Sequence, residues 1–160
     1  GSNLGERLAT LQGAVNAIAD TPDVWVTGIS PVYETEPVDA PAGSEAFLNA
    51  VVLIDTTLAA NRLLDRAQAI EDAFDRERTD VRNAPRTLDV DLIVVGDRRS
   101  HEEHLQLPHP RAAERAFVLK PWFDLEPDAS IPDFGPIADL LAATGVDGLT
   151  LREDLTLELE

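Results

Sequence analysis

Apolar residues along this chain recur at two different spacings, and the order of those spacings is the feature that most constrains its fold. Over residues 4–19 and again over 59–75 they recur every three or four positions, which predicts two amphipathic helices. Three stretches rich in β-branched residues have instead the length and composition of strands: 24–34, 47–56 and 88–95. The first is interrupted at Pro31, and a further helix is expected near 136–143. The sequence therefore predicts a β-β-α-β order behind a leading helix.

Length and composition indicate one ordinary globular domain. The chain has 160 residues, 44% of them hydrophobic, which is enough for a single core. We expect one domain over 1–160, with residues 146–160 as a C-terminal tail. No apolar run has the length of a membrane span, no signal-peptide pattern opens the chain, and cysteine is absent. These features predict a cytoplasmic protein with no membrane partner.

Acidic residues greatly outnumber basic ones. Asp and Glu total 30 against 13 Lys and Arg, which gives a formal net charge of −17. A surface so negative repels phosphates of nucleic acids, so a general nucleic-acid partner is not expected. Four arginines nevertheless gather in the expected loop before the third strand: Arg76, Arg78, Arg82 and Arg86. This cluster indicates a local anionic ligand.

Two aspartates stand on the third expected strand. Because strand side chains alternate between faces, Asp89 and Asp91 point to the same side and their apolar neighbours to the other. Two adjacent carboxylates on an apolar strand require a cation, and Mg²⁺, which binds carboxylate and phosphate oxygens, suits such a pair. Neutralisation by Arg86 or a neighbour, in a surface ion-pair network, is the alternative. The spacing alone leaves both interpretations open.

The arginine loop leads directly into this strand. The planar guanidinium matches phosphate oxygens and offsets the negative charge that develops during phosphoryl transfer. A single arginine is typical of a solvated surface, but several of them before Asp89 and Asp91 favour a phosphate site.

The histidines carry less information. His109 lies between two prolines, which hold it stiffly where it could contact a phosphate or a base, although a histidine in a proline turn is more often structural. His101 and His104 have the spacing of zinc ligands, but they lie in a polar stretch that resembles a solvated loop. A zinc site is therefore not expected.

Seven short motifs, taken together, resemble those of the 6-hydroxymethyl-7,8-dihydropterin pyrophosphokinase family. They occur in the same order and at compatible spacings from Gly1 to about residue 130, and the Pro-Arg-Thr-Leu-Asp-x-Asp run is highly specific. The motifs are Gly1-Ser-Asn-Leu-Gly5, Tyr33-Glu-Thr-Glu-Pro37, Phe47-Leu-Asn49-Ala-Val, Gln68-Ala-Ile-Glu71, Pro85-Arg-Thr-Leu-Asp-Val-Asp91, Leu107-Pro-His-Pro and Arg115-Ala-Phe117.

The resemblance implies a role for each matching residue. Asp89 and Asp91 are expected to bind two Mg²⁺ ions between ATP and a reduced pterin. The pterin ring is expected to contact Thr35, Glu36, Val38, Phe47, Asn49 and Phe117. ATP is expected to contact Gln68, Glu71, Arg78, Arg86, Leu92, His109 and Arg115. Arg76, Arg82 and Arg86 are expected to assist the transferring phosphates.

The resemblance also implies a fold. This chain differs from the family pattern in its first strand and in a motif before Pro85. The family has an α+β, ferredoxin-like antiparallel sheet between helices, in a three-layer αβα arrangement. Its first strand lies inside the sheet and precedes the Gly1-Ser-Asn motif, and that strand is missing here; the alternating tail over 149–159 is a poor substitute because of its acidic residues. Asn83-Ala84 stands where the family often has Trp-Gly, so an aromatic contact is lost or replaced.

The implied activity is transfer of pyrophosphate from ATP to 6-hydroxymethyl-7,8-dihydropterin in folate biosynthesis, giving AMP and the pterin diphosphate. One alternative is another Mg²⁺-dependent phospho- or nucleotidyltransferase. A second is a non-catalytic ligand-sensing module, because ferredoxin-like folds often serve regulation. We expect a monomer, with fusion to or association with other folate-pathway enzymes as a further possibility.

Overall fold

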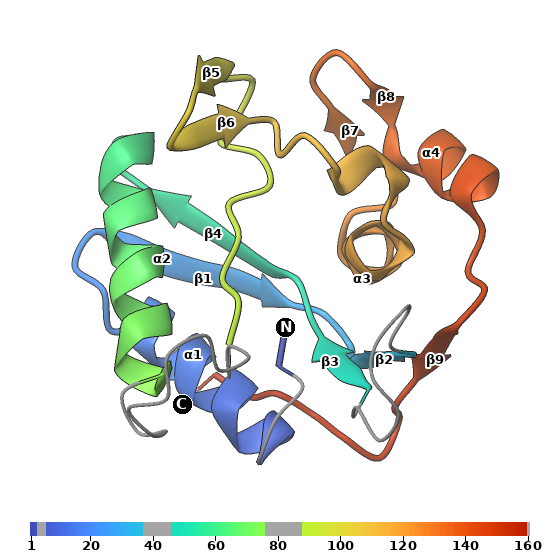
Figure 1. Cartoon of the computed structure of the whole chain (residues 1–160), viewed down its shortest axis with the longest axis horizontal. Coiled ribbons are helices and arrows are strands. Elements are labelled where there is room, and N and C mark those ends of the chain that lie inside the picture. The colour runs from blue at the N-terminus through green and yellow to red at the C-terminus, as the bar shows by residue number, and fades with distance from the viewer. Residues whose placement is uncertain (3–5, 37–45, 76–87, 160) are drawn as a thin grey trace.

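The computed structural model describes residues 1–2, 6–36, 46–75 and 88–159. They form an α+β domain in which helices and short antiparallel strands interleave (Figure 1). The elements are α1 (Arg7–Ala19), β1 (Val24–Ile29), β2 (Tyr33–Thr35), β3 (Phe47–Asn49), β4 (Val52–Thr56), α2 (Ala60–Asp75), β5 (Ser100–Glu102), β6 (Leu105–Leu107), α3 (Ala116–Leu125), β7 (Ser130–Ile131), β8 (Gly135–Pro136), α4 (Ile137–Thr144) and β9 (Leu149–Leu151). No helix among the described residues is long and apolar enough to cross a membrane.

The first four strands form one long hairpin that is interrupted midway. β1 pairs antiparallel with β4, and β2 pairs antiparallel with β3. Between the two ladders, the backbone N–H of Ser30 donates to Val51 O (2.9 Å), and the Val51 N–H donates to Ser30 Oγ (2.8 Å). Pro31 follows and has no N–H to donate, so the ladder breaks there. The strands expected over 24–34 and 47–56 are therefore confirmed, each divided in two.

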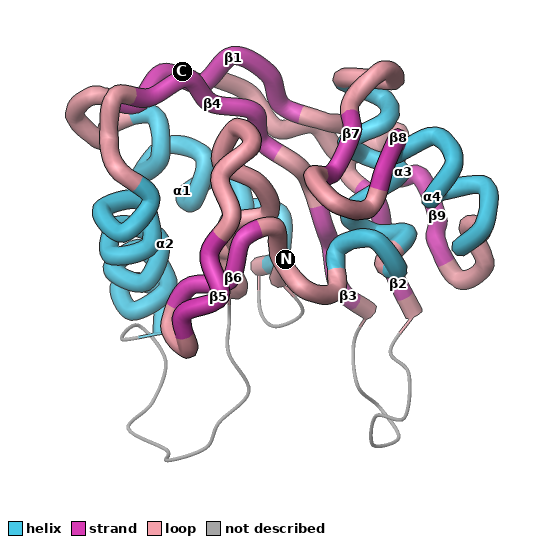
Figure 2. Tube along the Cα trace, turned by 90° about the horizontal axis from the view of Figure 1, so that it is seen from above, coloured by secondary structure: helices cyan, strands magenta, loops and turns pink. Residues whose placement is uncertain are grey.

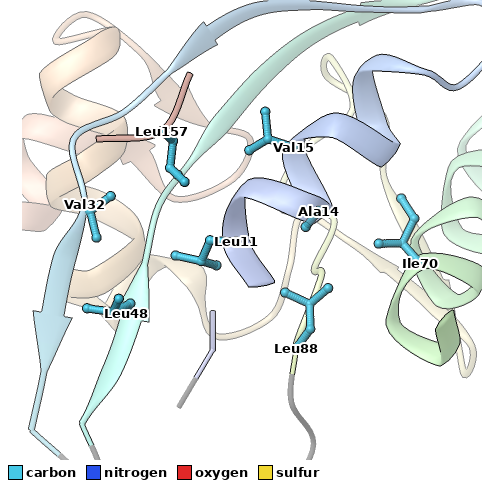
Figure 3. Packing of buried hydrophobic residues seen from close by; sticks show 8 residues of the cluster. All are labelled: Leu11, Ala14, Val15, Val32, Leu48, Ile70, Leu88 and Leu157. Atoms are coloured by element: carbon cyan, nitrogen blue, oxygen red, sulfur yellow. The ribbon is translucent and has the colours of Figure 1, made fainter. Parts of the chain in front are cut away.

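The expected helices are confirmed, and the first two cover one face of the hairpin. α1 and α2 lie within the predicted ranges and pack on β-strand side chains that alternate towards them. Figure 3 shows the resulting core cluster, which joins Leu11, Ala14, Val15, Val32, Leu48, Ile70, Leu88 and Leu157. Burying each large apolar side chain contributes about 2 kcal/mol, so this cluster is a principal source of stability.

The second pair of helices covers the other face. Strand alternation directs Val52 to the first cluster but Val51 and Leu53 to a second cluster built on α3 and α4. Figure 2 accordingly shows α1 and α2 together on one side of the molecule and α3 and α4 on the other. Helices therefore pack on both faces of the hairpin.

The prediction of a strand over 88–95 is wrong, because no residue of this segment belongs to a strand. Its apolar side chains do enter the core clusters. Its backbone bonds, however, are scattered: Asp89 exchanges two with Gly1, and Ile93 O accepts one from the His109 N–H (2.8 Å). A strand is defined by a continuous ladder, and the described residues place no strand beside this segment.

The C-terminal tail lies at the edge of the β2–β3 pair. β9 pairs antiparallel with β2, which gives the strand order β3-β2-β9. Beyond β9, Leu157 is buried in the first core cluster, and Gln12 on α1 exchanges hydrogen bonds of 2.6 and 2.9 Å with the Glu158 backbone. The tail therefore flanks β2 and does not substitute for a strand in the middle of the sheet.

Candidate active site

A cavity of about 590 Å³ lies between β4 and residues 88–95. Five of the residues expected at the site line it: Asn49, Asp89, Asp91, Leu92 and Phe117. Most of its other lining residues are apolar, and they come from several elements, among them α1, α2, β4 and residues 88–95. Since ATP and a pterin are polar, the apolar interior does not suit them. The end at which Asp89 and Asp91 are exposed is the candidate active site.

The expected pterin residues meet at the β2–β3 pair. Thr35, Phe47 and Asn49 share one face because they alternate with residues that point to α1. The buried Asn49 Nδ2 donates to Thr35 Oγ1 at 2.9 Å, which fixes the orientation of the amide. From α3, Phe117 is half-buried, with the Arg115 guanidinium 5.4 Å from its ring centroid. Glu36 is exposed, and its N–H already donates to Gly148 O (3.2 Å).

The two expected magnesium ligands lie beside the amino terminus. The Gly1 nitrogen donates to the backbone oxygen of Asp89 (2.8 Å), and the Asp89 N–H donates to Gly1 O (2.9 Å). The backbone that carries the first carboxylate is therefore bonded to Gly1.

Glu71 has a role that the sequence did not predict. Its side chain is buried on α2, and Oε2 accepts a hydrogen bond from the Val90 N–H at 2.8 Å. Val90 stands between Asp89 and Asp91, so this contact fixes the backbone that carries both carboxylates. Nothing in the local sequence around Glu71 indicates a bond to a residue 19 positions away.

The surroundings of His109 lower its pKa below the usual value. Burial lowers its pKa, and the charges of Arg115 and Arg111 lower it further, whereas Asp91 raises it. Its Nδ1 accepts from the Arg111 N–H at 3.2 Å, which leaves the proton on Nε2. His109 is thus equipped to donate one hydrogen bond near Asp91.

The chemistry of the donor set fits Mg²⁺. Among the described residues, no group of three or more His, Asp or Glu side chains could enclose a metal ion by itself. Mg²⁺ is commonly bound by one or two carboxylates, with water and substrate phosphates completing the shell, so Asp89 and Asp91 suffice. His104 instead lies 3.2 Å from Glu102 and 3.3 Å from Asn61 at an exposed position.

Not all the expected residues are gathered here. Gln68 is exposed on α2 and does not line the cavity. Val38 and the arginine cluster of Arg76, Arg78, Arg82 and Arg86 lie outside the described residues. The roles of these residues stay predictions.

An α+β domain that brings exposed carboxylates and a buried amide to one cavity defines a candidate phosphate-transferring enzyme. Residues 1–127 match the model of the 7,8-dihydro-6-hydroxymethylpterin-pyrophosphokinase (HPPK) family. The chain belongs to this family, and it is therefore an ATP-dependent pyrophosphokinase, a transferase of folate biosynthesis.

Named relatives agree with this assignment, each a 2-amino-4-hydroxy-6-hydroxymethyldihydropteridine pyrophosphokinase. The Pseudomonas aeruginosa protein is 40% identical over 149 residues, which cover 93% of this chain and 91% of the relative. The Methylorubrum extorquens protein is 40% identical over 131 residues, which cover 82% of each chain. The Bacillus subtilis protein is 41% identical over 121 residues, which cover 76% of this chain and 71% of the relative.

Proposed function

We propose that the chain carries out its family's reaction at the exposed end of the cavity. The hydroxymethyl oxygen of 6-hydroxymethyl-7,8-dihydropterin forms a bond to the β-phosphorus of ATP. The bond between that phosphorus and the oxygen bridging to the α-phosphate breaks, so AMP leaves and the hydroxyl proton is released. The product is (7,8-dihydropterin-6-yl)methyl diphosphate.

The observation that carries the proposal is the position of Gly1 between the two groups of site residues. A Cβ built on Gly1 would lie 2.6 Å from Asn49 Oδ1, and the Gly1 backbone bonds to Asp89 on its other side. A pterin on Asn49 would therefore hold its hydroxymethyl group beside the carboxylates. Such alignment of the two reactants lowers the barrier without a strong base.

We assign two Mg²⁺ ions to Asp89 and Asp91. Bound there, the ions would neutralise phosphate charge as it develops. Asn49 and Thr35 orient the ring, while Phe47 and Phe117 supply its apolar contacts. On the ATP side we assign Glu71, Leu92, His109 and Arg115, together with the predicted contacts of Gln68, Arg78 and Arg86. Glu36 and Val38 at the ring edge, and Arg76 and Arg82 at the phosphates, stay predictions from the sequence.

Product identity tests this proposal. The purified chain is incubated with Mg·ATP and the reduced pterin, and nucleotides are separated by anion-exchange chromatography. We expect AMP and pterin diphosphate in equal amounts, and no AMP when the pterin is omitted. Formation of ADP or free pyrophosphate would instead favour another phospho- or nucleotidyltransferase, and pterin binding without turnover would favour a sensing module.

We also propose that a β-strand joined to Gly1 completes the sheet and gives the ferredoxin-like, three-layer arrangement expected from the sequence. Support comes from Ser2, whose backbone pairs with Leu48 on β3, while Gly1 pairs with Asp89. The cavity, which Gly1 also lines, lies between β4 and residues 88–95, and most of its walls are apolar. A strand there would bond to both sides and bury the apolar surface.

Extension of the chain tests this second proposal. Eight alternating valine and threonine residues are added before Gly1, and the control extension carries two prolines within those eight. We expect the first to raise the melting temperature by about 5 °C or more and to increase turnover, and the control to do neither because proline breaks the ladder. Equal behaviour of the two extensions would contradict the proposal.

The cellular location and the oligomeric state of the chain are further proposals. Because the reaction consumes ATP, we expect it to take place in the cytoplasm. A monomeric state, and fusion to or association with other folate-pathway enzymes, stay predictions that sedimentation of the purified chain and of its native complexes would test.

A further inference from the structure

One arginine at the start of α1 contacts both strands that carry the expected pterin residues. Arg7 Nη1 donates to Glu34 Oε2 on β2 (2.9 Å) and to the backbone oxygen of Ala46 (2.7 Å), which directly precedes β3. A single guanidinium nitrogen therefore joins the middle residue of β2 to the residue that precedes β3, on either side of the Thr35–Phe47 pair. The side chains of Arg7 and Glu34 are 23% and 24% exposed, so the pair is partly shielded from water.

The Thr35–Phe47 end of the ladder carries the expected pterin contacts. The β2–β3 ladder has three residue pairs, and its last pair is Thr35 opposite Phe47. So short a ladder is easily opened at its end unless other contacts hold it. Glu34 points to the face opposite Thr35 because neighbouring side chains alternate. Arg7 therefore holds the strands from behind and does not touch the face that receives the ring.

A second arginine meets the same carboxylate from the tail. Arg152 Nη1 donates to Glu34 Oε2 at 2.9 Å, and the Arg152 N–H donates to Val32 O at 2.9 Å. Arg152 also makes two bonds to Asp154, of 3.0 and 2.8 Å. It thus contacts β2 but, among its described contacts, not β3. The two arginines share a carboxylate, and only Arg7 joins both strands.

We propose that Arg7 is a positioning residue for the pterin half of the active site. It keeps the end pair of β2 and β3 closed, so that Thr35, Phe47 and Asn49 stay in register for the ring. This inference rests on the pterin site proposed above. It assigns Arg7 an effect on pterin recognition and none on the ATP side.

Steady-state kinetics with each substrate varied in turn test the assignment. For Arg7→Gln we expect KM for the pterin to rise about tenfold, the scale of one partly buried charge-assisted bond, while KM for ATP stays within about twofold. Arg7→Lys keeps a charged donor and should restore most of the affinity. Arg152→Gln leaves Arg7 bound to both strands and should leave KM for the pterin within about twofold.

A matched control separates this effect from general loss of structure. Arg66 on α2 donates from Nε to Thr21 Oγ1 at 2.9 Å and so joins α2 to the turn between α1 and β1, without contacting Glu34 or Ala46 in its described hydrogen bonds. Arg66→Gln should lower the melting temperature without separating the two KM values. If Arg7→Gln does not fold, Glu34→Gln weakens the same contact and is expected to raise KM for the pterin in the same way.

The outcomes distinguish this inference from the site on which it rests. If Asn49→Ala raises KM for the pterin and Arg7→Gln does not, Arg7 has no positioning role and the site stands. A parallel rise of both KM values in Arg7→Gln, or no recovery in Arg7→Lys, would also overturn the inference. If neither Asn49→Ala nor Arg7→Gln changes KM for the pterin, the proposed pterin site is itself wrong.

Discussion

The two halves of the proposed active site, the pterin half and the carboxylate half, differ in how their backbones are held. The pterin half stands on β2, which is bonded to β3 on one side and to β9 on the other, with Asn49 fixed by Thr35. The carboxylate half stands on residues 88–95, which have no ladder among the described residues and lie beside the cavity. Its described anchors include Gly1, the Glu71 side chain and the His109 N–H, which donates to Ile93 O.

This difference indicates where the molecule is sensitive. A segment held by a few separate bonds opens at a lower free-energy cost than a strand with neighbours on both sides. We therefore expect the carboxylates to depend on whatever fills the cavity beside them, and the pterin half to be largely preformed. Changes in the two halves should accordingly alter different kinetic constants.

The largest effect is expected at the carboxylates. Asp89→Ala or Asp91→Ala should lower kcat by about a thousandfold or more, because charge stabilisation at the phosphates is lost. Both residues are exposed, so the melting temperature should change little. Asp97→Ala removes an exposed carboxylate from the turn that follows residues 88–95, and it is the control for the loss of one negative charge. If Asp89→Ala turned over at a rate close to that of the unaltered chain, Asp89 would not be needed for the reaction, and the proposed carboxylate half would be wrong.

A smaller effect, on a different constant, is expected at the amide. Asn49→Ala should raise KM for the pterin about ten- to a hundredfold, since one or two buried hydrogen bonds to the ring are lost. Thr35→Val removes only the partner of the amide and should have a weaker effect in the same direction. Substrate-dependence curves for the two variants check this order. A fall in kcat with KM unchanged would show that the halves are not separate.

The smallest effect concerns the support of β2 by α3. The Tyr33 hydroxyl donates to Asp124, and burial, followed by this hydrogen bond, raises the pKa of Tyr33 above its usual value. Tyr33 is the single tyrosine of the sequence, so absorbance near 295 nm titrates it alone. We expect no ionisation of the folded chain at pH 10 to 11, where a free tyrosine ionises. Ionisation at an ordinary pH would contradict a firmly packed β2.

The same pKa fixes the sign of a stability effect. A group whose pKa is raised on folding stabilises the fold below its unfolded pKa, and that contribution is lost as the pH rises through the folded value. Tyr33→Phe should therefore lower the free energy of unfolding by about 1 to 2 kcal/mol at neutral pH. The difference between the two proteins should shrink above about pH 10. Urea unfolding at pH 7 and 10.5 measures both quantities.

Local patterns account for the parts of the fold that the sequence predicted. α1, α2 and α4 follow from apolar spacing within each helix, and the break at Pro31 follows from its missing N–H. The β5–β6 hairpin was not predicted, because strands of three residues show too little alternation. Residues 88–95 have the composition of a strand, but pairing depends on a neighbour that local sequence does not specify.

The candidate site likewise has residues that the sequence predicted and contacts that it did not. Asp89, Asp91 and Asn49 were predicted because their motifs are specific, and the structure brings them to one cavity. The contacts of Glu71 with Val90 and of Arg7 with Ala46 were not predicted. They join residues 19 and 39 positions apart, and neither partner carries a local signal. Such supporting contacts become visible only once the chain is folded.

The burial of Leu157 against α1 has a consequence for biosynthesis. Ribosomes deliver a chain from its amino end, so α1 emerges well before the leucine that covers part of it. Until Leu157 has emerged, the nascent polypeptide keeps an uncovered apolar surface on α1. During that interval the growing chain exposes a surface of the kind that chaperones shield.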